Sequence, residues 1–467
     1  MKQIAVDILA QVLGKIFSSV IGLLAITQIC RYLSVEDFGG YTLAFSFLTF
    51  FYPLVDMGLN IIASREVAKN PERIHSILSE VFCIKIILTI LALLAILLLT
   101  SLLGYSATTR SLIFVASFSL FNTVIGTIEI ALIARHRLFL LALSQFFSSS
   151  IFLFLVYGLI NFGRGTAALI AAQVFSVFLS YVMVLLAIRG TTRLTKPSWS
   201  NIVSLFHQAF PLGIASLMVA CYFNIDLLML SKLMDESAVA YYGAAVRLLS
   251  FIAFIPHAVM MSLFPALSRS RQQEEKCFQS IFSFIFYILM LIIIPGAIWV
   301  TYHAKPIIEL IYTQSYQPSV HAFQIIIWSG LGIFASYLSG HTLVILGKQK
   351  FSIFISCIAA ICNVILNYFL IPKYGINGAA IATVITEILV ALLGFSIIAN
   401  YEKIIPFSMR MINVFVVMLA TFLLSLASRE SNWFASTALF LFFWVLSTFY
   451  LIFKKDHAML AKFQAIS

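Results

Sequence analysis

Charged residues are scarce in this chain of 467 residues. Asp, Glu, Lys and Arg together make up 10% of it, whereas 62% of it is hydrophobic. The apolar residues lie in long runs, such as Ile86 to Leu103 and Ile281 to Val300. A run of about 20 apolar residues spans a hydrocarbon core about 30 Å thick when it is helical. The scarcity of charge therefore excludes an ordinary soluble protein and predicts a membrane protein with many spans.

Cysteine is also rare, and the six cysteines form no CxxC pair. Most of them lie inside apolar runs, which favours packing over metal binding or disulfide formation. The phosphate-binding GxxxxGK[ST] loop, the GxSxG elbow and the HExxH zinc motif are all missing. Polar breaks between the runs reach about a dozen residues, whereas a soluble catalytic domain needs at least about 50. We therefore expect no enzyme, no catalytic residue, no metal site and no organic cofactor.

What the chain does contain is about fourteen apolar runs of spanning length. Lipid offers no partners to backbone amides, and barrel strands would alternate polar and apolar residues, so each run should be a helix. The expected fold class is all-α, a polytopic membrane protein of about 14 transmembrane helices. The expected spans are residues 9–31, 38–60, 77–103, 111–134, 139–162, 166–188, 203–231, 238–264, 279–302, 321–346, 352–371, 376–400, 411–428 and 433–453.

The net charge of +11 does not indicate a nucleic-acid partner, because the basic residues follow the loops. Most Lys and Arg lie in the tails and in alternate loops, for example Arg65, Arg135 and Arg269. The intervening loops carry one each, such as Arg110 and Arg164. This asymmetry follows the positive-inside rule and predicts that both termini are cytoplasmic.

The two halves of the chain resemble each other. Leu33, Glu36, Tyr41 and Ala44 recur 200 residues later as Leu233, Glu236, Tyr241 and Ala244. Six spans per repeat is an even number, which predicts two pseudo-symmetric six-helix lobes with parallel orientation, plus two C-terminal helices. The expected domains are residues 1–190 and 203–400 as the lobes, 191–202 as a cytoplasmic linker, and 401–467 as the last two helices and tail.

Polar side chains form stripes on three of the expected helices. An ionisable residue inside a span costs about 2.5–3.5 kcal/mol on insertion scales, so each is a functional candidate. Packing between helices is the alternative for small and amide residues, and snorkelling to the interface is the alternative for Asp56, Lys85 and Glu129. The stripes are Asp7, Gln11, Lys15, Ser18 and Gly22, then Ser119, Asn122, Gly126 and Glu129, then Ser356, Ala360, Asn363 and Asn367.

Two further charges lie deep within their expected spans. Arg247 is nine residues into its span, roughly 13 Å along the helix axis. Glu387 falls near the centre of its own span. Both are candidates for substrate or ion handling, and a pair within the protein, such as Arg247 with Asp226, is the alternative.

Several segments resemble the Wzx-like polysaccharide flippase family of the multidrug/oligosaccharidyl-lipid/polysaccharide exporter superfamily. RYLSVEDFGGYTLA (31–44) and DMGLNIIASREVAKN (56–70) are similar to its first loop and second helix. DLLMLSKLMDESAVAYYGAA (226–245), FIPHAVMMSLFPALSR (254–269) and LNYFLIPKYGINGAAIAT (366–383) match its second lobe. The resemblance covers most of residues 1–400 and rests on degenerate motifs.

The resemblance implies a V-shaped pair of lobes in the cytoplasmic (inner) membrane that moves an isoprenoid-pyrophosphate-linked oligosaccharide outward by alternating access, for cell-surface polysaccharide biosynthesis. Membrane lipids and other membrane proteins of polysaccharide assembly are the implied partners. Lys15, Arg31 and Arg247 are the cations expected to bind the head group. Gln11, Asn122, Asn363 and Asn367 are the expected sugar contacts, and Glu387 or Glu129 is expected to carry a coupling Na+ or H+. The rivals are a multidrug or cation antiporter on the same scaffold and a lipid-linked-sugar enzyme.

Overall fold

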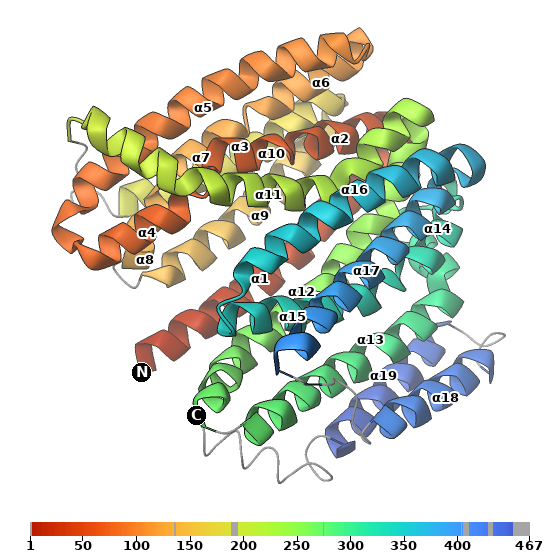
Figure 1. Ribbon diagram of the computed structural model, residues 1–467. Coiled ribbons are helices and arrows are strands. Elements are labelled where there is room, and N and C mark those ends of the chain that lie inside the picture. The colour runs from red at the N-terminus through yellow and green to blue at the C-terminus, as the bar shows by residue number, and fades with distance from the viewer. Residues whose placement is uncertain are drawn as a thin grey trace. The chain divides into compact units, whose positions relative to one another are not determined.

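The computed structural model describes residues 2–134, 137–187, 195–273, 275–402, 404, 411–427 and 433–451, and at some helix ends, as over residues 2–13, the backbone alone. Throughout these ranges the regular elements are helices (Figure 1). The chain forms two compact units, Met1–Ala240 and Tyr241–Ser467.

The first unit contains eleven α-helices and one short 3-10 helix in its described part. They are α1 (Lys2–Tyr32), α2 (Val35–Leu48), α3 (Phe51–Asp56), α4 (Leu59–Lys69), η1 (Pro71–Arg73), α5 (Ile74–Leu102), α6 (Ala107–Ser117), α7 (Leu120–Ile125), α8 (Ile128–Ala134), α9 (Leu138–Asn161), α10 (Thr166–Ala187) and α11 (Trp199–Leu233).

The second unit begins inside α12. Its elements are α12 (Glu236–Gln273), α13 (Glu275–Ile311), η2 (Gln314–Tyr316), α14 (Ser319–Ile326), α15 (Ser329–Ile345), α16 (Gln349–Tyr374), α17 (Ile376–Glu402), α18 (Met411–Ala427) and α19 (Trp433–Phe449). Most of α13 is buried, and its Phe282 and Leu289 lie at the centre of this unit's hydrophobic core.

The first twelve of the fourteen expected spans are confirmed, and the last two correspond to shorter helices. Twelve helical stretches in the described part of the chain are long and apolar enough to cross a membrane, and α18 and α19 are two shorter apolar helices. The sequence did not predict that three spans are broken: the second into α2, α3 and α4, the fourth into α6, α7 and α8, and the tenth into α14 and α15. The protein is therefore all-α and multi-pass.

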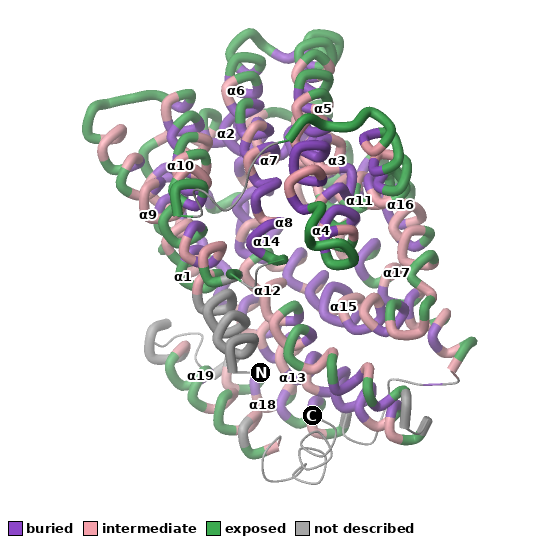
Figure 2. The backbone as a smooth tube through the Cα atoms, turned by 90° about the vertical axis from the view of Figure 1, so that its left-hand side faces the viewer, coloured by how far each residue is buried: buried purple, intermediate pink, exposed green. Residues whose placement is uncertain are grey.

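Helix α5 shows how the fold is suited to lipid. Its exposed side carries large apolar residues at helical spacing, namely Ile87, Leu91, Leu94, Leu98 and Leu102. Its buried side includes three polar residues, Lys85, Thr89 and Thr100. Figure 2 shows exposed and buried positions along α5. Apolar residues outside and polar residues inside are favourable where the surroundings are hydrocarbon.

The break between α3 and α4 is set by backbone conformation. Met57 has φ 47° and Gly58 has φ 76°, a left-handed pair that ends α3. A Cβ on Gly58 would lie 2.6 Å from Cβ of Leu212 in α11, so the break also packs tightly against that helix. The glycine is required for both reasons.

Residues 191–194 of the expected linker lie outside the described residues. The segment that follows is bound to the start of α5: the Thr195 amide donates to Ser79 Oγ at 2.8 Å. In the first turn of α11, Asn201 Nδ2 donates to Oε1 of the buried Glu80 at 2.7 Å. These bonds help to join α11 to α5 within the first unit.

Candidate functional site

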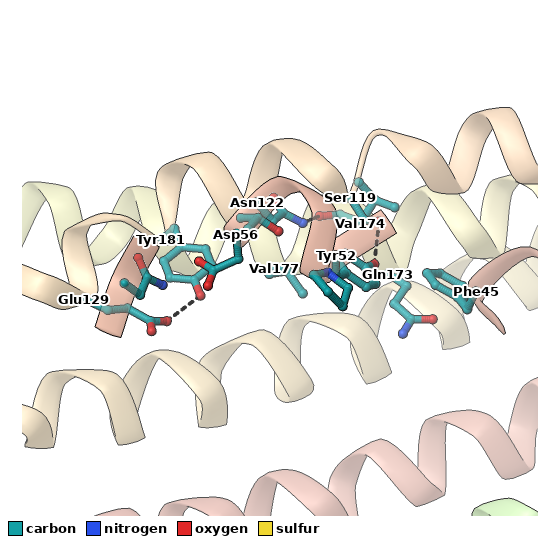
Figure 3. Close-up of a pocket in the computed structure, with 14 residues that line it drawn as sticks. Phe45, Tyr52, Asp56, Ser119, Asn122, Glu129, Gln173, Val174, Val177 and Tyr181 are labelled. Carbon is teal, nitrogen blue, oxygen red and sulfur yellow. Dashed lines mark hydrogen bonds between the residues drawn. The ribbon is translucent and has the colours of Figure 1, made fainter. Parts of the chain in front are cut away.

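The first unit contains an open cavity of about 480 Å³. Two helix breaks border it, because α3, α4, α7 and α8 contribute residues on either side of Met57 and Gly126. In Figure 3, Glu129 and Phe45 mark its opposite ends. Its wall carries hydroxyl, amide and carboxylate groups, from Tyr52, Asp56, Asn60, Ser119, Asn122, Glu129, Gln173 and Tyr181.

Hydrogen bonds within the wall hold some of these groups in place. Tyr52 and Ser119 share a hydrogen bond of 2.6 Å between their hydroxyl oxygens (Figure 3). Asn122 Nδ2 donates to the carbonyl of Val174 at 3.2 Å. The Tyr41 hydroxyl, in α2, donates to Gln173 Oε1. Each bond links different segments of the chain, so these hydrogen bonds fix the orientation of the polar side chains in the wall.

Glu129 has a defined position in this wall. Its Oε1 accepts a hydrogen bond from the Tyr181 hydroxyl at 2.7 Å (Figure 3). Both residues also line a second cavity of about 250 Å³, which contains Lys15 and several serines. The two cavities therefore share Glu129, Val177 and Tyr181. The Glu129 carboxylate therefore lies between the amide groups of the first cavity and the second cavity, which contains the Lys15 ammonium.

Asp56 is paired with a lysine behind the wall. Lys85 Nζ lies 2.8 Å from Asp56 Oδ1, and the lysine side chain is 0% exposed. Lys85 thus forms an ion pair although its side chain is fully buried. The pair is inside the first unit, so snorkelling does not explain Lys85.

The structure brings together three of the predicted residues of the first unit. Lys15, Asn122 and Glu129 line the two adjoining cavities. Gln11 belongs to α1, but its side chain lies outside the described residues. Arg31 is exposed in the last turn of α1 and lines neither cavity.

The predicted residues of the second unit lie elsewhere. Asn363 Nδ2 donates to Thr386 Oγ1 at 3.4 Å, and Asn367 Nδ2 donates to Asn363 Oδ1 at 2.8 Å. The asparagines therefore help α16 to pack against α17, where Glu387 is also buried. Arg247, on α12, is partly buried, and its buried Nη1 has no hydrogen-bond partner among the described residues.

The sequence reading missed several residues of the wall. Tyr52, Asn60, Gln173 and Tyr181 are single polar residues in apolar runs and belong to no stripe. Gln173 could have been selected from the sequence, because an amide side chain within a span needs a hydrogen-bond partner. Tyr52 and Asn60 lie on either side of the break between α3 and α4, which the sequence did not predict.

Comparison with known families gives two matches. The model of the family described as polysaccharide biosynthesis protein matches residues 4–271, more than half of the chain. The MatE model matches residues 211–369.

Two curated relatives illustrate the similarity. The Haloferax volcanii protein named "Probable low-salt glycan biosynthesis flippase Agl15" is 27% identical over 199 residues, which is 42% of this chain and 42% of the relative. The match thus spans less than half of that relative. The capsular polysaccharide biosynthesis protein CapF of Staphylococcus aureus is 21% identical over 388 residues, covering 82% of this chain and 96% of the relative.

Solved structures share the fold. The lipid II flippase MurJ in an inward closed conformation aligns with a TM-score of 0.79 and 16% identity, over 96% of this chain and 99% of that one. An inward-facing multidrug resistance MATE family transporter aligns with a TM-score of 0.71 and 15% identity, over 82% of this chain and 94% of that one. At these identities the likeness concerns the fold.

Proposed function

Since the chain belongs to the family of polysaccharide biosynthesis proteins, we propose that it is a flippase for an isoprenoid-pyrophosphate-linked oligosaccharide. It would move this lipid across the cytoplasmic membrane by alternating access, for cell-surface polysaccharide biosynthesis. The observation that supports this most is the first-unit cavity, whose wall of hydroxyl and amide groups lies within membrane-spanning helices. Sugars present hydroxyls that both donate and accept, and such a wall offers both kinds of partner.

The head group would be bound by cations. A pyrophosphate forms charge-assisted hydrogen bonds with Lys and Arg, and these are stronger away from bulk water. Lys15 lies in the cavity that adjoins the polar wall, so it is the first candidate. Arg247 has an unpartnered buried nitrogen and is the second, and Arg31 is the third.

In the same proposal Asn122 and Gln11 contact the sugar. Asn122 keeps acceptor capacity in its carbonyl oxygen while its amide nitrogen bonds to Val174. Asn363 and Asn367 would act less directly, because they bond to α17 and to each other. Transport of this kind makes and breaks no covalent bond, so no residue is assigned a catalytic role.

The driving force would be an ion gradient, with Na+ or H+ bound at Glu129 or Glu387. Glu129 lines both cavities and Glu387 is buried on α17. We further propose that both termini are cytoplasmic, as the distribution of Lys and Arg predicts. Membrane lipids and other membrane proteins of polysaccharide assembly would be its partners.

Depletion of the protein in its native host tests the proposal. Lipid-linked oligosaccharide should accumulate on the inner leaflet, and its composition would identify the sugar. Re-expression of the wild-type chain should clear it, whereas a Lys15→Ala variant inserted at the same level should clear it more slowly. Normal appearance of the oligosaccharide on the outer leaflet after depletion would contradict the proposal.

A multidrug or cation antiporter is the second candidate. The MatE match over residues 211–369 favours it, as does the presence of Glu129 in the first-unit wall. An antiporter would expel cationic dyes from cells at the expense of an ion gradient, and a flippase would not. Dye efflux without any change in lipid-linked oligosaccharide would favour this second candidate.

A further inference from the structure

Lys85 is an unusual residue for its position. It lies on α5, a helix of which one side is apolar and exposed, yet its own side chain is 0% exposed. An ammonium within a span is costly and persists where it is paired and fully hydrogen-bonded. The surroundings of Lys85 supply one ion pair and two hydrogen bonds.

Three oxygen atoms surround the ammonium. Asp56 Oδ1 lies at 2.8 Å, Asn60 Oδ1 at 2.9 Å and the carbonyl oxygen of Thr123 at 3.3 Å. A lysine ammonium has three donors and no acceptor. Two of its hydrogen bonds go to Asn60 and Thr123, whereas Asp56 Oδ1 contributes an ion pair and no hydrogen bond. A carboxylate, an amide oxygen and a backbone carbonyl are also the ligands that hard metal cations take from proteins.

These oxygens come from the two broken spans of the first unit. Asp56 is the last residue of α3, and Asn60 is in the first turn of α4, on the other side of the left-handed pair. In the other span, Thr127 N–H bonds to Val124 O, a tighter turn that leaves the Thr123 carbonyl to Lys85. The ammonium therefore joins both helix breaks at the edge of the polar cavity.

We propose that Lys85 is a built-in cation that occupies what would otherwise be an exchangeable cation site formed by Asp56, Asn60 and the Thr123 carbonyl. It holds the two breaks together and neutralises Asp56. Among the described residues of the cavity wall, Glu129 is then the carboxylate without an ion pair, and exchangeable positive charge would bind there. The inference does not depend on which substrate the cavity accepts.

Removal of the lysine side chain should create a cation site. In purified Lys85→Ala, Asp56 loses its partner, and the space of three methylene groups and the ammonium is left, its inner end beside three oxygens. Methylammonium, Na+ or K+ should then raise the thermal unfolding midpoint by about 2 °C or more beyond any rise in the wild type, because a ligand that binds the folded state stabilises it. Lys85→Arg is the conservative control and should gain no such response.

A second variant assigns the effect to this site. In Lys85→Ala/Asp56→Asn the carboxylate is gone, so the cation response should disappear. Equal responses of the wild type and Lys85→Ala to all three cations would overturn the proposal, as would persistence of the response in the double variant. If Lys85→Ala folds poorly, Lys85→Met is compared with the double variant Lys85→Met/Asp56→Asn. Lys85→Met keeps Asp56 and should show the cation response, whereas the double variant should not.

Discussion

Glu129 belongs to both polar cavities of the first unit, and Tyr181 fixes its orientation. A carboxylate that accepts one hydrogen bond of 2.7 Å retains further lone pairs for a ligand or a coupling ion. Its position between Lys15 and the amide-lined wall makes it the most direct test of the site.

Glu129→Gln should lower transport by roughly tenfold or more, because it removes the charge while it preserves size and a partner for Tyr181. Hydrogen bonds to charged groups contribute about 1.5–3 kcal/mol, which is about 10- to 100-fold. The measurement is the rate of lipid-linked oligosaccharide flipping in proteoliposomes. Glu72→Gln, at an exposed position on η1, is the matched control and should leave the rate unchanged. An unaltered rate in Glu129→Gln would remove this residue from the site.

Arg247→Ala should abolish transport while the protein still inserts at its normal level. The guanidinium has a buried nitrogen without a partner, which a substrate phosphate could occupy. Arg247→Lys should keep part of the activity, since it retains the charge but loses the planar donor pair. Arg110→Ala, at an exposed position on α6, is the control, and equal activity of the two alanine variants would disprove the assigned role.

At the scale of residues the sequence predicted several side chains that line the cavities and left the setting of Lys85 open. Lys15, Asn122 and Glu129 were predicted from helical stripes, because a period of 3.6 residues reports which side chains share a face. Lys85 was open to interpretation as a snorkelling residue, because a linear sequence does not show which neighbouring helices cover a side chain. Its partners Asp56 and Thr123 come from other spans.

Among the helices, α13 shows how the second unit accommodates a proline within a helix. Pro295 has no N–H, so it leaves the carbonyl of Leu291 without its usual partner four residues on. Trp444 Nε1, on α19, donates to that carbonyl at 3.2 Å. The ring of Trp299 stacks on Phe440 of the same helix, with centroids 5.3 Å apart. The C-terminal helix thus supplies the donor that the proline removes.

Trp444→Phe should lower the thermal unfolding midpoint by about 2 °C, because one hydrogen bond of about 1 kcal/mol is lost and the carbonyl is left unsatisfied. In a Pro295→Ala background the same substitution should cost much less, since residue 295 then provides its own N–H to Leu291. The comparison is a double-mutant cycle followed by thermal unfolding in detergent. Trp199→Phe, at an exposed position, is the control. Equal losses in both backgrounds would show that the indole donor is not coupled to the proline.

The positions of the membrane-spanning helices could be predicted from composition, whereas the breaks within them could not. Long apolar runs predict where a helix crosses the membrane, since every backbone group must be bonded within the span. The breaks at Met57–Gly58 and Gly126–Thr127 depend on backbone conformations and on carbonyls that another helix satisfies. Gly58 was visible in the sequence, but many glycines in such helices serve packing alone.

For the whole molecule the charge distribution makes a prediction about topology. Cysteines placed at Gly165, between α9 and α10, and at Asn70, between α4 and α5, should label from opposite sides in an otherwise cysteine-free protein. A membrane-impermeant maleimide added to intact cells should react at residue 165 and not at residue 70, because basic loops stay in the cytoplasm. Reaction at residue 70 alone would reverse the proposed orientation.

The sequence by itself determined that the protein is a multi-pass helical membrane protein, because hydrophobic length and backbone hydrogen bonding leave one class of structure for fourteen apolar runs of this kind. It also indicated the family, through segments that the family model covers in residues 4–271. Only the tertiary structure decided where the polar groups meet. The cavity wall draws its residues from α3, α4, α7, α8 and α10, and the buried ammonium of Lys85 joins two broken spans. Contacts between polar groups on different helices depend on how the helices pack and where they break. The periodicity of a single segment does not show either.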